Sequence, residues 1–310
     1  MKTNRFTQLL LALLLFSAGL TAQNAGTESV SINGPKFTHP LLAKWISEYA
    51  KVNPKVKIKL EQKLTGSQTT DLNIVSGIPV KEEQKESPDV VYVGRYALLP
   101  VTNSRNPLLA TLTKRGLSKK EVDKLFFEVI DYEADEPKKE KPKYVVTIYS
   151  RENQASTSNV LAGYFGHTSS EIRGKKVLGD DIYLLSAIKK DSIGITYNNL
   201  GYLFDTNSRK LKDGIALLPL DLKKESREVL SGNVDDAIVV LEKNQIETIP
   251  VEKIGFMLSP QNERKEVADF LKWVLTDGQK FNHGLGFLNL DKSLLSEQSN
   301  KLTNKLLSYN

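Results

Sequence analysis

Residues 31–60 read SINGPKFTHPLLAKWISEYAKVNPKVKIKL, and the spacing of apolar residues changes twice within this stretch. Polar and apolar residues alternate up to Asn33-Gly34-Pro35, which predicts a strand followed by a turn. Apolar residues then recur at helical spacing, at Leu41, Leu42, Trp45, Ile46 and Tyr49. Asn53-Pro54 predicts the end of this helix, and the alternation resumes at 56–60. The stretch therefore predicts a strand, a helix and a second, parallel strand, which is the repeating unit of α/β proteins.

The same change between strand and helix patterns continues along the rest of the chain. Runs of β-branched and other apolar residues predict strands at 72–75, 90–93, 145–148, 193–197 and 215–222. Helical spacing predicts helices at 117–127, 182–188, 267–275 and 294–307. Ser118 and Glu121 have the spacing of a capping box at the start of the first of these helices. The whole pattern predicts an α/β fold, and 310 residues are enough for two domains.

The first residues have the composition of an export signal. Lys2 and Arg5 precede an apolar run from Leu9 to Leu20, and small residues lead to Ala22. We expect a signal peptide over residues 1–22, because the run is too short to span a bilayer. The chain contains no cysteine, which excludes disulfides, thiolate metal sites and a lipid-modified cysteine after the signal. The sequence therefore predicts an exported, periplasmic protein.

Charge and histidine spacing exclude several functional classes. The net charge is +6, and it becomes 41 minus 37, or +4, without the basic residues of the signal. No surface pattern of basic and aromatic residues accompanies this small excess, so we expect no nucleic-acid partner. His39, His167 and His283 are far apart in sequence, which predicts no metal site. No nucleophile elbow or phosphate loop is present, so we expect no catalytic residues and no enzyme activity.

A second informative stretch, residues 144–166, reads YVVTIYSRENQASTSNVLAGYFG. It predicts a strand, then Arg151, then a hydroxyl-rich turn with Ser156 and Thr157, then the start of a helix. A helix N-terminus, hydroxyl groups and a guanidinium fork together suit a bound oxyanion. The alternative is that Ser156 or Thr157 only caps the helix and that Arg151 is solvated at the strand end.

The order of these segments resembles a known family, the periplasmic phosphate-binding proteins of ABC importers, with the type 2 periplasmic binding fold. Four segments carry the resemblance: residues 31–60, RYALLPVTNSRNPL at 95–108, DSIGITY at 191–197, and ADFLKWV at 268–274 with DGQ at 277–279. The resemblance covers nearly all of the chain after the signal peptide.

The resemblance implies a two-lobed α/β fold with crossing hinge strands and an anion between the lobes. Residues 27–97 with 212–310 would form lobe one, and 98–211 would form lobe two. Such a protein would be a monomer without a cofactor. It would bind an inorganic, phosphate-like oxyanion and deliver it to a membrane ABC permease.

The resemblance also implies which residues bind the ligand. The first-loop positions of the family match Lys36, Phe37 and Thr38, and the second loop supplies Ser67. The stretch described above supplies the remaining three, Arg151, Ser156 and Thr157.

Two positions depart from the family pattern. Gly77 stands where the family has an aspartate that accepts a hydrogen bond from protonated phosphate, and Asn153 stands where a carboxylate would orient the arginine. Asp71 and Asp89 are candidates to replace the missing acceptor in space. The sequence therefore leaves two hypotheses. The protein is an oxyanion-binding component of an importer, or it keeps the two-lobed fold without anion binding and acts as an interaction or scaffold partner in the envelope.

Overall fold

The computed structural model describes residues 29–62, 70–77, 90–128, 130–131, 138–139, 143–153, 155–258 and 264–308. The expected signal peptide, Ser67 and Asp89 lie outside these residues. Within the described ranges, no helix has the length and hydropathy needed to cross a bilayer.

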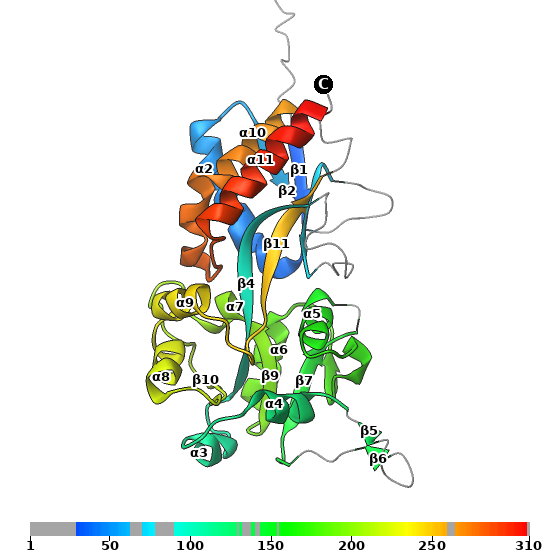
Figure 1. Ribbon diagram of the computed structural model, residues 1–310, viewed down its shortest axis with the longest axis vertical. Helices are drawn as coiled ribbons and strands as arrows, with labels where there is room; N and C mark the ends of the chain where they lie inside the picture. Colours follow the sequence, from blue (N-terminus) through cyan, green and yellow to red (C-terminus); the bar gives the residue numbers. More distant parts are fainter. Residues whose placement is uncertain are drawn as a thin grey trace, which may run out of the picture.

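The chain forms two α/β lobes that share strands (Figure 1). The upper lobe contains strands β1 (Ser29–Asn33), β2 (Lys57–Leu60) and β3 (Leu72–Ser76). The lower lobe contains β7 (Thr147–Arg151), β8 (Lys175–Val177), β9 (Gly194–Asn199) and β10 (Ile215–Leu217). Two long strands, β4 (Val90–Asn103) and β11 (Val251–Met257), run side by side between the lobes. The predicted α/β fold with crossing strands is confirmed.

Strand direction changes at the crossing. The sheet order is β2-β1-β3-β11-β4-β9-β7-β8, with β10 also paired to β4. Pairs within each lobe, such as β1–β2 and β7–β9, are parallel, whereas β4 and β11 are antiparallel to each other and to their neighbours. The β4–β11 register shifts between Ile254 and Gly255, which marks an irregularity within the crossing ribbon. The parallel pairs place the carboxyl ends of β7, β8 and β9 on one edge.

The first unit folds as its sequence pattern predicts. A 3₁₀ turn, Lys36–Thr38, leads into α2 (His39–Val52), and Pro40 lies in its first turn, where a missing N–H costs no hydrogen bond. Trp45 is fully buried, and its Nε1 donates to the carbonyl of Gly278 at 2.9 Å. The buried face of α2 thus joins the N-terminal unit to the segment after α10 (Lys265–Leu275).

The remaining helices cover the two lobes. They are α3 (Leu108–Leu112), α4 (Lys119–Phe126), α5 (Ser156–Tyr164), α6 (Ile182–Lys190), α7 (Leu200–Leu203), α8 (Lys224–Gly232), α9 (Val234–Lys243) and α11 (Lys292–Ser308). The capping box predicted for α4 is confirmed, because Ser118 and Glu121 hydrogen bond each other's backbone N–H. In Figure 1, α8 and α9 lie beside the lower lobe, and the chain returns upward along β11. The lobe boundary near residue 212 stays a prediction, and β10, α8 and α9, which follow this residue, lie at the lower lobe.

The carboxylate of Asp71 is engaged within the upper lobe, where it joins the start of β3 to β1 and Arg264. Its Oδ2 accepts hydrogen bonds from the backbone N (2.6 Å) and Oγ (2.8 Å) of Ser31, and its Oδ1 accepts one from Arg264 Nη1 at 3.3 Å. Burial raises the pKa of Asp71, but the Ser31 hydrogen bonds and Arg264 outweigh it, so the pKa is lowered overall. Asp71 is therefore already engaged and does not replace the missing acceptor.

We expect Asp71→Asn to lower the free energy of unfolding by about 2 kcal/mol at pH 7, since it weakens hydrogen bonds to a charged acceptor. The folded-state pKa lies below the unfolded-state value. The contribution of Asp71 is therefore complete above the unfolded-state pKa and is lost as the pH falls through the folded-state pKa. Urea unfolding of both proteins across acidic pH measures this. The exposed Asp213, changed to Asn, is the control. A difference that persists unchanged below both pKa values would contradict the expectation.

Candidate functional site

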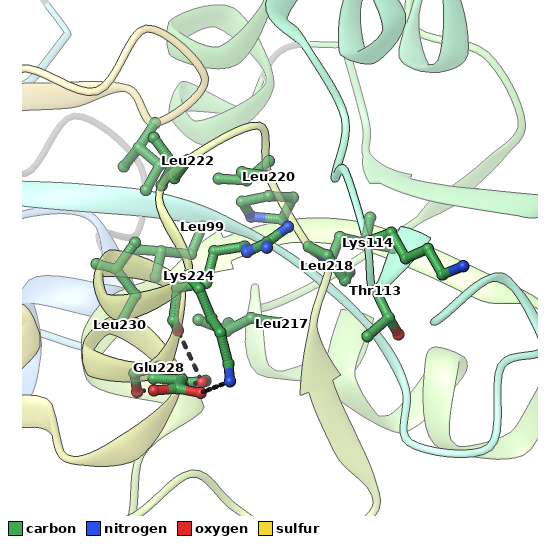
Figure 2. A pocket seen from close by; sticks show the side chains of 15 residues that line it. Leu99, Thr113, Lys114, Leu217, Leu218, Leu220, Leu222, Lys224, Glu228 and Leu230 are labelled. Atoms are coloured by element: carbon green, nitrogen blue, oxygen red, sulfur yellow. Dashed lines mark hydrogen bonds and ion pairs between the residues drawn. The ribbon is translucent and has the colours of Figure 1, made fainter. Parts of the chain in front are cut away.

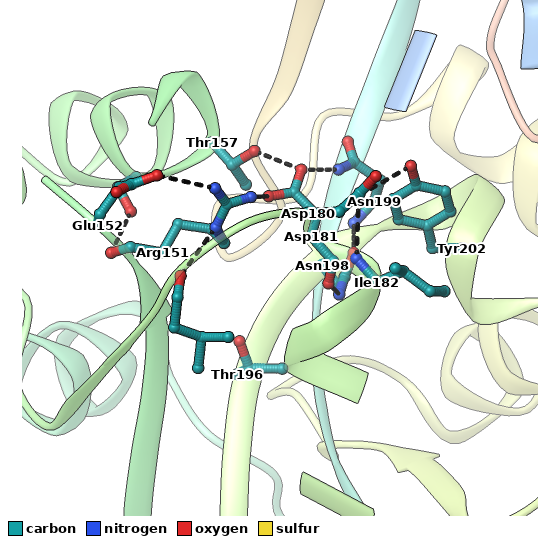
Figure 3. Close-up of polar contacts among 12 residues, drawn as sticks. Arg151, Glu152, Thr157, Asp180, Asp181, Ile182, Thr196, Asn198, Asn199 and Tyr202 are labelled. Carbon is teal, nitrogen blue, oxygen red and sulfur yellow. Dashed lines mark hydrogen bonds and ion pairs between the residues drawn. The ribbon is translucent and has the colours of Figure 1, made fainter. Parts of the chain in front are cut away.

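Arg151 is the last residue of β7, and only 8% of it is exposed. Its Nε donates to the carbonyl of Val177 at 3.0 Å, its Nη2 to Glu152 Oε1 at 3.2 Å and its Nη1 to Asp181 Oδ1 at 2.9 Å (Figure 3). Three acceptors in three directions hold the guanidinium plane in one orientation. The alternative that Arg151 is solvated at the strand end is therefore wrong.

The carboxylate of Asp181 lies at the centre of this cluster (Figure 3). Besides Arg151, it accepts hydrogen bonds at Oδ2 from Thr157 Oγ1 at 2.7 Å and from Asn199 Nδ2 at 2.9 Å. The residue is 4% exposed, and its own backbone carbonyl accepts a hydrogen bond from Asn198 Nδ2. Donors from β7, α5 and the end of β9 thus converge on one oxyanion, which is part of the chain itself.

Burial changes how easily Asp181 keeps its charge. Desolvation raises its pKa, and the Thr157 hydrogen bond and Arg151 lower it by less, so the pKa is raised overall. The neighbouring acid Asp180 accepts a hydrogen bond from Tyr202 Oη at 3.1 Å. With Glu152 and Asp180 also nearby, the carboxylates around Arg151 outnumber the one guanidinium. An incoming anion therefore needs the Asp181 carboxylate to move away or to become protonated.

The hydroxyl residues at the start of α5 have different roles. Thr157 donates to Asp181, and Ser158 Oγ donates to the carbonyl of Arg151 at 3.0 Å. Ala155 occupies the N-cap and no side chain caps the helix, so the alternative that Ser156 or Thr157 is the cap is wrong. Ser156 is half-buried in the first turn, beside Thr157.

The three residues predicted for the first loop lie in the upper lobe, in different environments. Lys36 is exposed. Phe37 belongs to the core, where its ring centroid lies 4.7 Å from that of Tyr96 and 6.2 Å from that of Phe287. Thr38 is fully buried, and its hydroxyl donates to the carbonyl of Pro35 at 2.7 Å. The hydroxyl proton of Thr38 is thus engaged within its own turn.

Gly77, at the position where the family has aspartate, touches the lower lobe. Its φ is +59°, a conformation that favours glycine, and a Cβ added there would lie 1.9 Å from Val160 Cγ2 on α5. The end of β3 therefore meets α5. The contact is apolar, and Val160 fills the space that an aspartate side chain would need.

A cavity of about 80 Å³ lies beside the cluster, between Phe37, Tyr96, Asn199, Tyr202 and Phe287. Tyr96 is 2% exposed, and neither its hydroxyl nor Asn199 Oδ1 has a hydrogen-bond partner among the described residues. Burial raises the pKa of Tyr96 and the nearby Ser76 hydroxyl lowers it by less, yet the two hydroxyls make no hydrogen bond of standard geometry. Unpartnered buried polar atoms are uncommon in folded proteins, and two of them lie on residues that line this cavity.

The three histidines are separate and each has its own partner. His39 contacts the carbonyl of Gly34, His167 contacts Asp123 and His283 contacts Glu242. Among the residues that the structure describes, no group of three His, Cys, Asp or Glu side chains is placed to hold a metal ion.

Sequence reasoning missed Asp181 and Asn199, which complete the cluster around Arg151. Asp180-Asp181 precedes a helix and has the composition of an ordinary helix start. The pair Asn198-Asn199 at the end of a buried strand was the available signal, because polar residues there face the carboxyl edge of a sheet.

Comparisons with known proteins support the fold. No protein-family model and no curated protein sequence matches the chain. A solved structure from Clostridium perfringens, described as a phosphate ABC transporter substrate-binding protein with bound phosphate, is 14% identical. It covers 85% of this chain and 100% of its own, with a TM-score of 0.60.

Two further structures agree with it. An ABC-type phosphate transport receptor from Vibrio cholerae is 10% identical, covers 85% of this chain and 100% of its own, and has a TM-score of 0.56. A possible phosphate-binding protein from Planctomyces limnophilus is 15% identical. It covers 90% of this chain and 98% of its own, with a TM-score of 0.50. Likeness at these identities concerns the fold, and the chain has the two-lobed fold of the type 2 periplasmic binding proteins.

Proposed function

We propose that this protein is an exported solute-binding protein that takes a phosphate-like oxyanion between its lobes and delivers it to a membrane ABC importer. One observation carries the proposal. Arg151, Thr157 and Asn199 converge on a single carboxylate at 2.7–2.9 Å, so this donor set already binds an oxyanion group. The fold shared with proteins described as phosphate-binding adds support. The signal peptide expected at residues 1–22 fits a periplasmic monomer.

In this proposal the ligand replaces the Asp181 carboxylate. Arg151 stays oriented when Asp181 leaves, because Val177 and Glu152 hold two of its nitrogens independently. The amide of Asn199 and the hydroxyl of Thr157 then donate to the ligand, and Ser156 lies next to them in the first turn of α5. Lys36 adds an exposed positive charge on the upper lobe. Ser67, outside the described residues, belongs to the same proposed set.

The proposed site discriminates poorly between protonated and fully deprotonated oxyanions. A carboxylate acceptor selects for protonated phosphate because it requires a proton to accept, and Gly77 offers none. We therefore expect phosphate and sulfate to bind with affinities within about tenfold of each other. Calorimetric titration of residues 23–310 with phosphate, sulfate, molybdate and tungstate measures this selectivity. A preference for phosphate of several hundredfold would contradict it.

Arg151→Ala is expected to weaken oxyanion binding between about tenfold and a hundredfold, because one charge-assisted hydrogen bond contributes roughly 1.5–3 kcal/mol. The same calorimetry checks it. Arg105→Ala is the matched control, since Arg105 is an exposed arginine outside the cluster. Equal affinity of the Arg151 and Arg105 variants would place the binding site elsewhere.

A second candidate function rests on two specific contacts. Val160 fills the space beside Gly77, and Asp181 occupies the donors of Arg151 and Thr157. Both contacts suit a two-lobed envelope protein that has lost anion binding and acts as an interaction or scaffold partner. If no oxyanion binds below millimolar concentration, and Asp181→Asn does not produce binding, this second function replaces the first.

A further inference from the structure

A larger cavity, of about 560 Å³, lies beside α8 and shares no residue with the Arg151 cluster (Figure 2). Its walls come from five places: β4, the residues just after α3, the segment 217–222 that begins at the last residue of β10, one face of α8, and Ile249 just before β11. This volume lies in the range of small-molecule sites. The sequence patterns did not indicate it, because residues 224–243 were not predicted to be helical.

Apolar side chains, mainly leucines, make most of the wall. Leu99, Leu218, Leu220, Leu230 and Ile249 belong to the buried core, while Leu217 and Leu222 are half-buried. Figure 2 shows the leucine side chains arranged around the cavity. Thr113 and Ser231 supply the only hydroxyl groups among the lining residues. A wall with so few neutral hydrogen-bonding groups suits an aliphatic ligand better than a sugar or a nucleotide.

Charged side chains stand on the α8 face of the same cavity. Lys224, Arg227, Glu228 and Ser231 recur at positions i, i+3, i+4 and i+7, so the helix presents them on one side. Lys114, just after α3, also lines the cavity. Three cations against one carboxylate leave a net charge of +2 at the cavity. Glu228 pairs with Lys224 at 3.7 Å, which leaves the guanidinium of Arg227 outside that pair.

Arg227 points to the kind of group that would complete the site. Its Nη1 atom is buried and has no hydrogen-bond partner among the described residues. A buried cationic nitrogen without an acceptor is unfavourable, and a carboxylate matches the guanidinium fork with two parallel hydrogen bonds. Apolar walls and one unpartnered guanidinium nitrogen together define an amphipathic site.

We propose that this cavity binds an amphipathic anion, an alkyl carboxylate of medium chain length. The chain lies against the leucine wall, and the carboxylate accepts hydrogen bonds from Arg227. Lys114 and Lys224 add long-range attraction. The site is independent of the oxyanion proposed between the lobes, since none of its residues contacts Arg151 or Asp181.

Calorimetric titration of residues 23–310 with decanoate tests the proposal, with decanol and decyltrimethylammonium as ligands of matched chain length. We expect one decanoate per chain and at least tenfold weaker binding of the other two. Each methylene removed from the alkyl chain should weaken binding about fourfold, from the burial of apolar surface. Arg227→Gln should weaken decanoate binding between tenfold and about a hundredfold. Lys55→Gln, the same charge change at an exposed lysine of the upper lobe, should leave it unchanged.

Leu217→Trp is the second variant, because a larger side chain at this half-buried position fills the cavity without removing a charge. It should abolish decanoate binding and leave oxyanion binding unchanged. Circular dichroism and thermal unfolding confirm that both variants fold. The proposal is overturned if the unaltered protein does not bind decanoate or binds it without saturation. It is also overturned if decanol binds with the same affinity as decanoate, or if Arg227→Gln leaves the affinity for decanoate unchanged.

Discussion

Asp181→Ala is expected to lower the free energy of unfolding by about 3–5 kcal/mol, the usual effect of removing one partner from a buried ion pair. Arg151 would keep its charge in a nearly buried position, and Thr157 and Asn199 would lose their shared acceptor. Urea unfolding at pH 7 measures the change. Asp213→Ala, at an exposed acid, is the control and should change stability by less than about 0.5 kcal/mol.

Inorganic phosphate is expected to recover part of this loss, because it supplies the oxyanion that the variant lacks. At a phosphate concentration of 100 times the dissociation constant, the gain would be about 2.7 kcal/mol. The unaltered protein should gain less, since phosphate must there displace Asp181. A variant as stable as the unaltered protein would show that the Asp181 cluster contributes little. Equal effects of phosphate on both proteins would show that Asp181 does not occupy the ligand position.

Gly77→Ala is expected to destabilise the protein by about 1–3 kcal/mol more than Gly166→Ala. Both glycines have a positive φ, +59° and +82°, so both alanine variants carry comparable backbone strain. Only Gly77 also meets a neighbour, since its added Cβ would lie 1.9 Å from Val160 Cγ2, whereas nothing lies within 4 Å of a Cβ at Gly166. The difference therefore reports overpacking where the two lobes touch.

A double-mutant cycle with Val160→Ala isolates this contact. In the Val160→Ala background, the excess cost of Gly77→Ala should disappear, because the clashing methyl group is gone. Urea unfolding of the unaltered protein, Gly77→Ala, Val160→Ala and the double variant measures this excess cost. Gly166→Ala, made in the unaltered protein and in Val160→Ala, is the reference. An equal cost for both glycines, or an excess that survives Val160→Ala, would mean that β3 and α5 are not in contact in solution.

Local sequence patterns predicted the fold well where apolar spacing is strong. The helix around Trp45 and the strands beside it are examples, because their buried faces follow regular periods. α8 was missed because Leu230 is its only fully buried residue, so its apolar face is too narrow to detect. The strand predicted at 215–222 ends at Leu217, where the next pairing position on β4 is Pro100, which has no N–H to donate.

The candidate site was predictable only where its residues are close in sequence. Arg151 and Thr157 lie on either side of the short loop between a strand and a helix. The sequence pattern of strand, loop and helix start indicated that they share a site. Asp181 and Asn199 reach them only because β8 and β9 pair with β7 in parallel, and sequence spacing does not contain that long-range pairing. Val160 was unremarkable in sequence because its contact with Gly77 depends on how the two lobes meet.

The ribbon of β4 and β11 limits how the lobes can move apart. Both backbones continue from one lobe into the other and are hydrogen bonded side by side, and an extended backbone cannot lengthen. The two lobes can therefore neither slide past each other nor separate along the strands. They can move relative to each other only if the ribbon bends or twists. The register shift between Ile254 and Gly255 loosens only the pairing with β4, because the pairing of β11 with β3 stays regular across the same two residues. In the proposed function, a solute would reach Arg151 through a swing of one lobe, and two strands would set the arc of that swing.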